Sequence, residues 1–102
     1  MYWRMKSGYL YIISNPAHIG WFKIGVTEDI KSRLNVYQTS DPKRSYKVEY
    51  HVFHPDCYIA EKNIKETMKY FALDIKKEWY KVDLGIAKSR LDEQVEDYIN
   101  LL

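Results

Sequence analysis

The sequence lacks the paired cysteines and the long apolar runs that are typical of small secreted proteins and of membrane proteins. Its 102 residues include one cysteine, Cys57, which excludes an internal disulfide and favours a reducing compartment. No apolar run is long enough to span a membrane, and the opening MYWRMKSG lacks a signal-peptide pattern. We therefore expect a soluble, cytoplasmic protein that does not contact a membrane.

An excess of charge of one sign is also missing. Sixteen Lys and Arg residues against fourteen Asp and Glu residues leave a net charge of +2, far from that of a protein that holds DNA by charge alone. Any contact with nucleic acid must therefore be local. The four glycines and three prolines form no linker or repeat, so we expect a single domain over residues 1–102.

What is present is a clear pattern of short strands and longer helices. β-branched and aromatic runs predict strands, and apolar residues at helical spacing predict helices, with Thr27 and Asp56 as candidate N-caps. The predicted elements are strands at 8–14, 21–26 and 46–53, helices at 28–38, 56–71 and 85–102, and an extended piece at 78–84. Three strands in an antiparallel meander with helices packed on them make a small α+β domain.

The two long helices each have a predicted apolar stripe that packs on the sheet. These stripes are Ala60, Ile64, Met68 and Phe71 in the first of them, and Ile86, Leu91, Val95, Ile99 and Leu102 in the last helix. We expect the helix at 85–102 to serve packing alone.

Lys23 is unusual because it interrupts the apolar run WFKIG of the second predicted strand. Side chains two apart share a face of a strand, so a hairpin places Tyr11 of the first strand near Lys23 and Gly25 of the second. Gly25 has no side chain and lets another group approach the backbone. Arg33 and Tyr37, four apart on the next helix, share a helical face that can meet them.

A phenol, an amine, a guanidinium and a second phenol in one place suit an anionic ligand. A guanidinium clamps phosphate oxygens, and a partly desolvated amine can release its proton and act as a base. The alternative is structural, with Lys23 extending along the sheet edge to water and Arg33 paired with a surface acid. Spacing alone leaves both interpretations open.

Other polar side chains are weaker candidates. His51, His54 and Cys57 are zinc-ligand types at intervals of three, but strand residues three apart face opposite ways and no fourth ligand stands out, so we expect no zinc site. Further candidate contacts to a substrate phosphate lie in predicted loops, where plain exposure is the alternative. They are His18, Lys43, Arg44 and Lys47.

The segment GYLYIISNP…GWFKIGVTEDIKSRLNVYQTSDP resembles the first half of a GIY-YIG nuclease domain, in the phage and large-DNA-virus branch whose second motif reads KIG. The first motif falls on residues 9–11 and the second on 23–25. Arg33 matches the essential arginine of the family, Tyr37 its tyrosine or histidine, and Glu61 the glutamate that holds the metal. EWY at 78–80 resembles the closing EWF of that branch, so the resemblance covers about residues 8–83.

Four positions depart from the family pattern. Tyr9 stands where the first motif has glycine, and Lys23 stands where the second has tyrosine, although family members with lysine there are active. Lys65 lies four residues after Glu61, where the branch often has histidine. The late asparagine or glutamine of the family has no obvious counterpart, and Glu78 is our candidate.

The resemblance implies a metal-dependent DNA endonuclease with the GIY-YIG fold, of phage or mobile-element origin. Glu61 would hold one Mg²⁺ or Mn²⁺, Tyr11 and Lys23 would position and deprotonate water, and Arg33 and Tyr37 would bind the phosphate. Without a separate DNA-reading domain, specificity should be modest unless the protein dimerises or acts with a partner protein. The other function class is a catalytically inactive DNA-binding or protein-interaction module, favoured by the weak net charge and the missing late residue.

Overall fold

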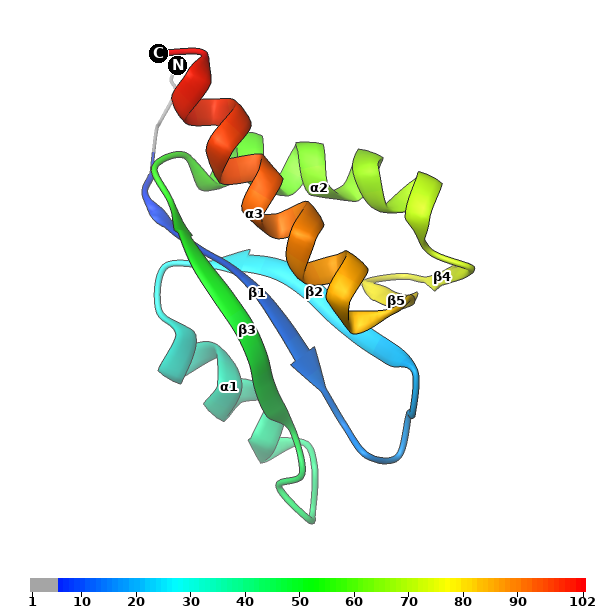
Figure 1. The fold of residues 1–102 in the computed structure, drawn as a ribbon. Helices are drawn as coiled ribbons and strands as arrows, with labels where there is room; N and C mark the ends of the chain where they lie inside the picture. The colour runs from blue at the N-terminus through cyan, green and yellow to red at the C-terminus, as the bar shows by residue number, and fades with distance from the viewer. Residues whose placement is uncertain (1–5) are drawn as a thin grey trace.

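The computed structural model describes residues 6–102, and this part of the chain has one antiparallel sheet of five strands and three helices (Figure 1). Across the sheet, the strands are β3 (Lys47–His54), β1 (Gly8–Ser14), β2 (Trp21–Thr27), β5 (Trp79–Lys81) and β4 (Asp74–Lys76). The helices are α1 (Ile30–Thr39), α2 (Cys57–Phe71) and α3 (Leu84–Asn100). The α+β class is confirmed. The expectation about a signal peptide concerns in part residues 1–5, which lie outside the described residues.

The sheet differs from the predicted one in size and order. Two short strands, β4 and β5, extend it beyond β2, so the prediction of three strands was wrong. All three residues of β4 are exposed, and so short an exposed strand leaves no burial pattern in the sequence. The predicted meander was also wrong, because α1 carries the chain across the sheet and β3 pairs with β1.

Different helices cover the two faces of the sheet. Leu10, Ile12 and Ile24 point toward α2 and α3 and belong to the buried core, which also includes Tyr80 and Leu91. Helix α1 lies on the opposite face, beneath β1 and β3 (Figure 1). The predicted site residues Tyr11, Lys23 and Tyr37 lie on that second face, whereas Glu61 belongs to α2.

The two helices next to the site begin at side-chain caps. Asp56 caps α2 as predicted, its carboxylate accepting the N–H groups of Tyr58 and Ile59. Helix α1 is capped by Asp29, which accepts the Ser32 N–H at 3.1 Å, so the prediction of Thr27 was wrong. The Thr27 hydroxyl instead accepts the N–H of Asp29 at 3.2 Å and shapes the turn before the helix.

The predicted apolar stripes are buried in the middle of the two helices, but at the helix ends the residues predicted to be buried are exposed. Ala60, Ile64 and Met68 of α2 are buried, but Phe71 at its C-terminus is 39% exposed. In α3, Ala87 and Leu91 are buried, whereas three of the residues predicted for this stripe are exposed: Ile86 and Ile99 in the helix, and Leu102 beyond its end. Figure 1 shows the reason for the last two, because the final turns of α3 run past the end of the sheet.

Within residues 6–102, no helix is both long enough and apolar enough to cross a membrane.

Candidate active site on the α1 face of the sheet

The centre of the candidate site is the pairing of Tyr11 with Gly25. In the β1–β2 hairpin Tyr11 lies directly opposite Gly25 and Ile13 directly opposite Lys23, so the predicted sharing of one face is confirmed. The Tyr11 ring, only 2% exposed, lies over position 25. A Cβ added there would be 2.7 Å from the Tyr11 hydroxyl oxygen, a distance too short for any side chain. Glycine is therefore required for Tyr11 to occupy this place.

Tyr37 of α1 completes a pair of phenols. The Tyr11 and Tyr37 hydroxyl oxygens are 2.9 Å apart and share a hydrogen bond. Burial raises the pKa of Tyr11 far above its usual range, and the hydrogen bond to Tyr37 raises it further. Burial also raises the pKa of Tyr37. Both hydroxyls therefore stay protonated near neutral pH, and they can orient a water molecule or pass a proton but cannot act as resting bases.

Lys23 lies among aromatic rings beside this pair. Its Nζ is 4.8 Å from the centroid of the Tyr37 ring and 5.6 Å from that of Trp79, which is its neighbour on β5. The ring faces hold the amine on the sheet surface, where it is half-buried. The predicted neighbourhood of Lys23, Tyr11 and Tyr37 is thus present.

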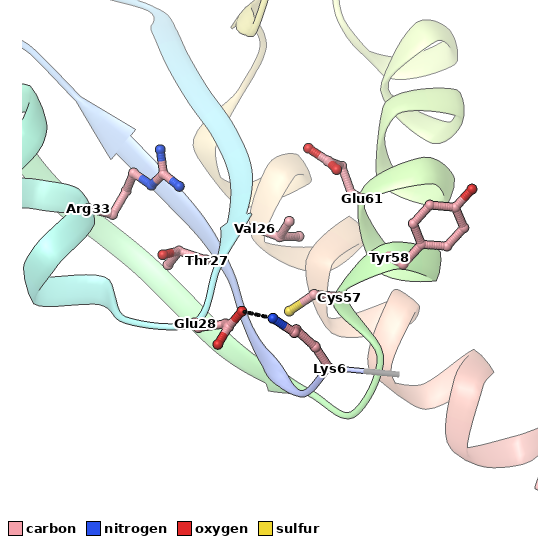
Figure 2. A pocket seen from close by; sticks show the side chains of 8 residues that line it. All are labelled: Lys6, Val26, Thr27, Glu28, Arg33, Cys57, Tyr58 and Glu61. Carbon is pink, nitrogen blue, oxygen red and sulfur yellow. Dashed lines mark ion pairs between the residues drawn. The ribbon is translucent and has the colours of Figure 1, made fainter. Parts of the chain in front are cut away.

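Arg33 and Glu61 line one pocket of about 410 Å³ at the end of β2. Figure 2 shows Arg33 on α1 and Glu61 on α2, with the β2 strand between them. The Asp29 cap starts α1 directly after β2, which brings Arg33 to this end of the sheet. Helix α2 is held there by the Cys57 N–H, which donates to the Lys6 carbonyl at 2.8 Å.

Two charged side chains act on the Tyr11 and Tyr37 hydroxyl groups. The Arg33 guanidinium lowers the pKa of both Tyr11 and Tyr37, against the larger effect of burial, and the Glu78 carboxylate raises it. Glu78 lies in the turn between β4 and β5, and its carbonyl accepts the Ile24 N–H at 3.3 Å. This hydrogen bond attaches the turn to β2, and it places Glu78 beside the phenol pair.

Residues 8–101 match the model of the T5orf172 domain. The chain belongs to the T5orf172 domain family. This domain is phage-derived and falls in a nuclease-related group. No curated protein and no solved structure matches the chain.

Glu61 is the candidate metal ligand of this T5orf172 domain. Its side chain is 45% exposed in an open pocket, and carboxylate oxygens are the donors that Mg²⁺ and Mn²⁺ prefer. Within residues 6–102, no three His, Cys, Asp or Glu side chains gather as a metal-binding group. The pocket lining also includes Glu28, which is paired with Lys6 at 3.4 Å, so a cation here would have one or two carboxylates and would keep water as its other ligands. Lys65 competes for the same carboxylate, because its Nζ lies 3.7 Å from a Glu61 oxygen.

The two histidines considered as zinc ligands lie on opposite faces of the sheet. His51 packs edge-on against Tyr9 on the α1 face, at 5.6 Å between ring centroids. His54 is buried on the other face, and its Nδ1 accepts the Asp56 N–H at 2.9 Å. Cys57 is buried at the start of α2, and burial raises the pKa of its thiol, so the thiol stays protonated.

The predicted loop contacts lie away from the Arg33–Glu61 pocket. Lys43 and Arg44 are exposed in the turn after α1, at the end of α1 farthest from its cap, and Lys47 is exposed at the start of β3. His18 lies in the β1–β2 loop against the Trp79 ring, at 5.3 Å between centroids. These four residues line no part of that pocket.

Two aromatic residues of the site were not predicted. Tyr46 packs against Tyr37 at 5.4 Å between ring centroids, and Trp79 lies 6.4 Å from Tyr46 and flanks Lys23. The sequence contained one signal for Trp79, its place between Glu78 and Tyr80 in EWY. Alternation along β5 could have assigned it to the Lys23 face, but only after β5 had been paired with β2.

Proposed function

We propose that this protein is a divalent-metal-dependent endonuclease that hydrolyses DNA phosphodiester bonds, as a stand-alone catalytic domain of the GIY-YIG type. One observation carries the proposal. Arg33 and Glu61, from separate helices, line one open pocket, and the Arg33 charge also acts on Tyr11 and Tyr37, the phenol pair beside Lys23. Membership of a phage-derived, nuclease-related family and the GIY-YIG-like motifs support the same activity.

Arg33 is the proposed phosphate-binding residue. Its guanidinium offers fixed, always charged donors at the wall of a pocket that remains open to solvent. Such donors stabilise the charge that builds on the phosphate oxygens as a fifth oxygen approaches phosphorus. Removing one donor of this kind lowers the rate by roughly 10²–10³-fold.

Glu61 is the proposed ligand of Mg²⁺ or Mn²⁺, which when bound would supply Lewis-acid polarisation of the scissile phosphate. The remaining ligands would be water and phosphate oxygens. Glu61 is well placed for this because its carboxylate points from α2 toward β2 in Figure 2, into the same pocket as Arg33.

Lys23 is the proposed general base. It accepts a proton from the attacking water as the new P–O bond forms, and the P–O bond to the leaving oxygen breaks with its electron pair remaining on that oxygen. Tyr11 and Tyr37 stay protonated and orient the water through their hydroxyl groups. This division of roles follows from the chemistry: a phenol with a strongly raised pKa is a poor base, and Lys23 is the amine beside it.

The test is cleavage of supercoiled plasmid with Mg²⁺ or Mn²⁺, with EDTA as the metal-free reference. We expect nicked or linear product from the wild type and a loss of roughly 10²–10³-fold in rate for Arg33→Ala and for Glu61→Gln. Glu66→Gln is the matched control. Glu66 lies on the same helix but is exposed and paired with Lys69 at 2.9 Å.

Each outcome has a distinct meaning. Cleavage by the wild type that survives in both site variants would point to a contaminating nuclease and contradict the proposal. Absence of cleavage by a folded wild type that still binds DNA would instead identify the catalytically inactive binding module.

A further inference from the structure

A second pocket lies on the same face of the sheet as Lys23. Its volume is about 240 Å³, and its lining consists of His18, Trp21, Lys76 and Trp79. The strand register explains the gathering: Trp79 is opposite Lys23 on one side and Lys76 on the other, and Trp21 is two residues before Lys23. Three strands and one loop thus place two indole rings, an imidazole and an amine together.

This pocket is not covered by any helix of the described chain. Helix α1 lies beneath β1 and β3, whereas the pocket is formed by β2, β5 and β4 at the other side of the sheet (Figure 1). Trp21 and Trp79 are partly exposed. Indole rings are large apolar surfaces, and two of them open to solvent in one hollow are typical of a binding site.

The lining indicates the chemistry of the ligand. Flat aromatic walls favour a flat ring that stacks on them, and the four lining side chains include an amine but no carboxylate. Lys81, opposite Trp21 on β5, adds a second positive charge to the same face, partly offset by Asp74 opposite it on β4. A planar ring that carries a negative group is the best match, which describes a nucleobase attached to its phosphate.

The pocket also adjoins the proposed reaction site. The Lys23 Nζ lies between the two sites, 5.6 Å from the Trp79 ring centroid and 4.8 Å from that of Tyr37. Tyr46 continues the aromatic surface from Trp79 to Tyr37. A DNA strand whose phosphate reaches Lys23 and Arg33 therefore has a neighbouring nucleotide at the pocket.

We infer that the His18–Trp21–Lys76–Trp79 pocket binds an unpaired nucleobase of the DNA strand, stacked on the indole rings, next to the phosphate that is cut. The inference rests on the proposed function for its choice of ligand. Bases within a duplex are already stacked and paired, and extruding one costs a few kcal/mol. The protein should therefore prefer DNA with unpaired nucleotides, such as single strands, flaps or bulges, to an intact duplex.

The test measures binding without cleavage. The anisotropy of a labelled oligothymidylate is measured in EDTA with wild type, Trp79→Ala, Trp79→Phe and Trp21→Ala, whose folding is checked by circular dichroism. We expect Trp79→Ala to weaken binding by about 5- to 150-fold, as the loss of one base–aromatic stack does, and Trp79→Phe to restore most of it. Trp21→Ala should also weaken binding, and this variant replaces Trp79→Ala in the test if Trp79→Ala does not fold. Tyr70→Ala is the matched control, since Tyr70 is an aromatic residue 84% exposed on α2.

A second arm compares DNA structures. The same strand is offered alone, as a duplex and as a duplex with a flap, and we expect the wild type to bind the duplex most weakly. Equal affinity for all three, or unchanged affinity in folded Trp79→Ala and Trp21→Ala, would overturn the inference. Because this assay contains no metal, it tests base binding separately from cleavage. Binding of unpaired bases by a protein that does not cut DNA would support the inference and contradict only the proposed endonuclease. Cleavage of duplex DNA by variants without these indoles would contradict the inference and leave the proposed endonuclease standing.

Discussion

Replacing Gly25 by alanine tests the packing on which the candidate site depends. The new Cβ would lie 2.7 Å from the Tyr11 hydroxyl oxygen and 3.0 Å from its Cζ, so the ring has to move. Tyr11 is 2% exposed and cannot swing into solvent. Overpacking of this kind costs about 1–3 kcal/mol, and losing the 2.9 Å hydrogen bond to Tyr37 adds about 0.5–1.5 kcal/mol. We therefore expect the free energy of unfolding to fall by about 2–4 kcal/mol.

The cause of this loss can be isolated with Tyr11→Phe. In the phenylalanine background the closest atom is gone, and the hydrogen bond has already been lost. Gly25→Ala should then cost about 1–2 kcal/mol less than it does in the wild type. Urea unfolding followed by circular dichroism gives all four free energies of the double-mutant cycle.

The outcome that refutes the reasoning is additivity. If the two single changes add within about 0.5 kcal/mol, the Tyr11 hydroxyl is not what Gly25 accommodates. Gly85→Ala is the control for a general effect of alanine. Its Cβ would meet Asp83 Oδ2 at 3.1 Å, the oxygen that accepts the Ile86 N–H and caps α3, so any cost here comes from that cap and should be the same with and without Tyr11→Phe.

Three further predictions concern titration and metal binding. Burial raises the pKa of Tyr11 in the folded protein, so the stability that the neutral hydroxyl contributes is complete below about pH 10. Above that pH this stability is lost by about 1.4 kcal/mol per pH unit. Urea unfolding on both sides of pH 10 should therefore show a steeper fall in the free energy of unfolding for wild type than for Tyr11→Phe. Burial lowers the pKa of His54, so stability is present above about pH 6.5 and falls below it; His54→Asn keeps an acceptor but does not titrate, and an equally steep acid decline in this variant would contradict the assignment. Lys65→Gln removes the cation 3.7 Å from Glu61 and should tighten Mn²⁺ binding by about 2- to 5-fold in calorimetry, whereas unchanged affinity would mean that Glu61 is not the ligand.

Much of the local structure could be predicted because its causes lie within a few residues of one another. The strand at 8–14 and the Asp56 cap follow from side-chain type and spacing, and alternation in the hairpin brought Lys23 to the face of Tyr11. The helix start at Asp29 was missed because Thr27 and Asp29 are both good caps, and the choice between them depends on how the turn after β2 closes.

The errors in the sheet and the stripes have a common origin in long-range packing. Whether β3 lies beside β2 or β1 depends on which way α1 crosses, and three exposed residues form β4 only because β5 is there to pair with them. Ile99 has the helical spacing of a core residue, but α3 extends past the sheet, so no neighbour covers it.

The sequence by itself supplies the side chains of the proposed site: one guanidinium, one amine, two phenols and a helical carboxylate, at spacings that resemble a known motif. Their meeting depends on contacts between distant segments, since Arg33 and Glu61 reach one pocket only when α1 and α2 dock at the same end of β2. The indole pocket needs three strands in register before it exists. Side-chain type is encoded locally, whereas distance between side chains is set by burial of the whole core.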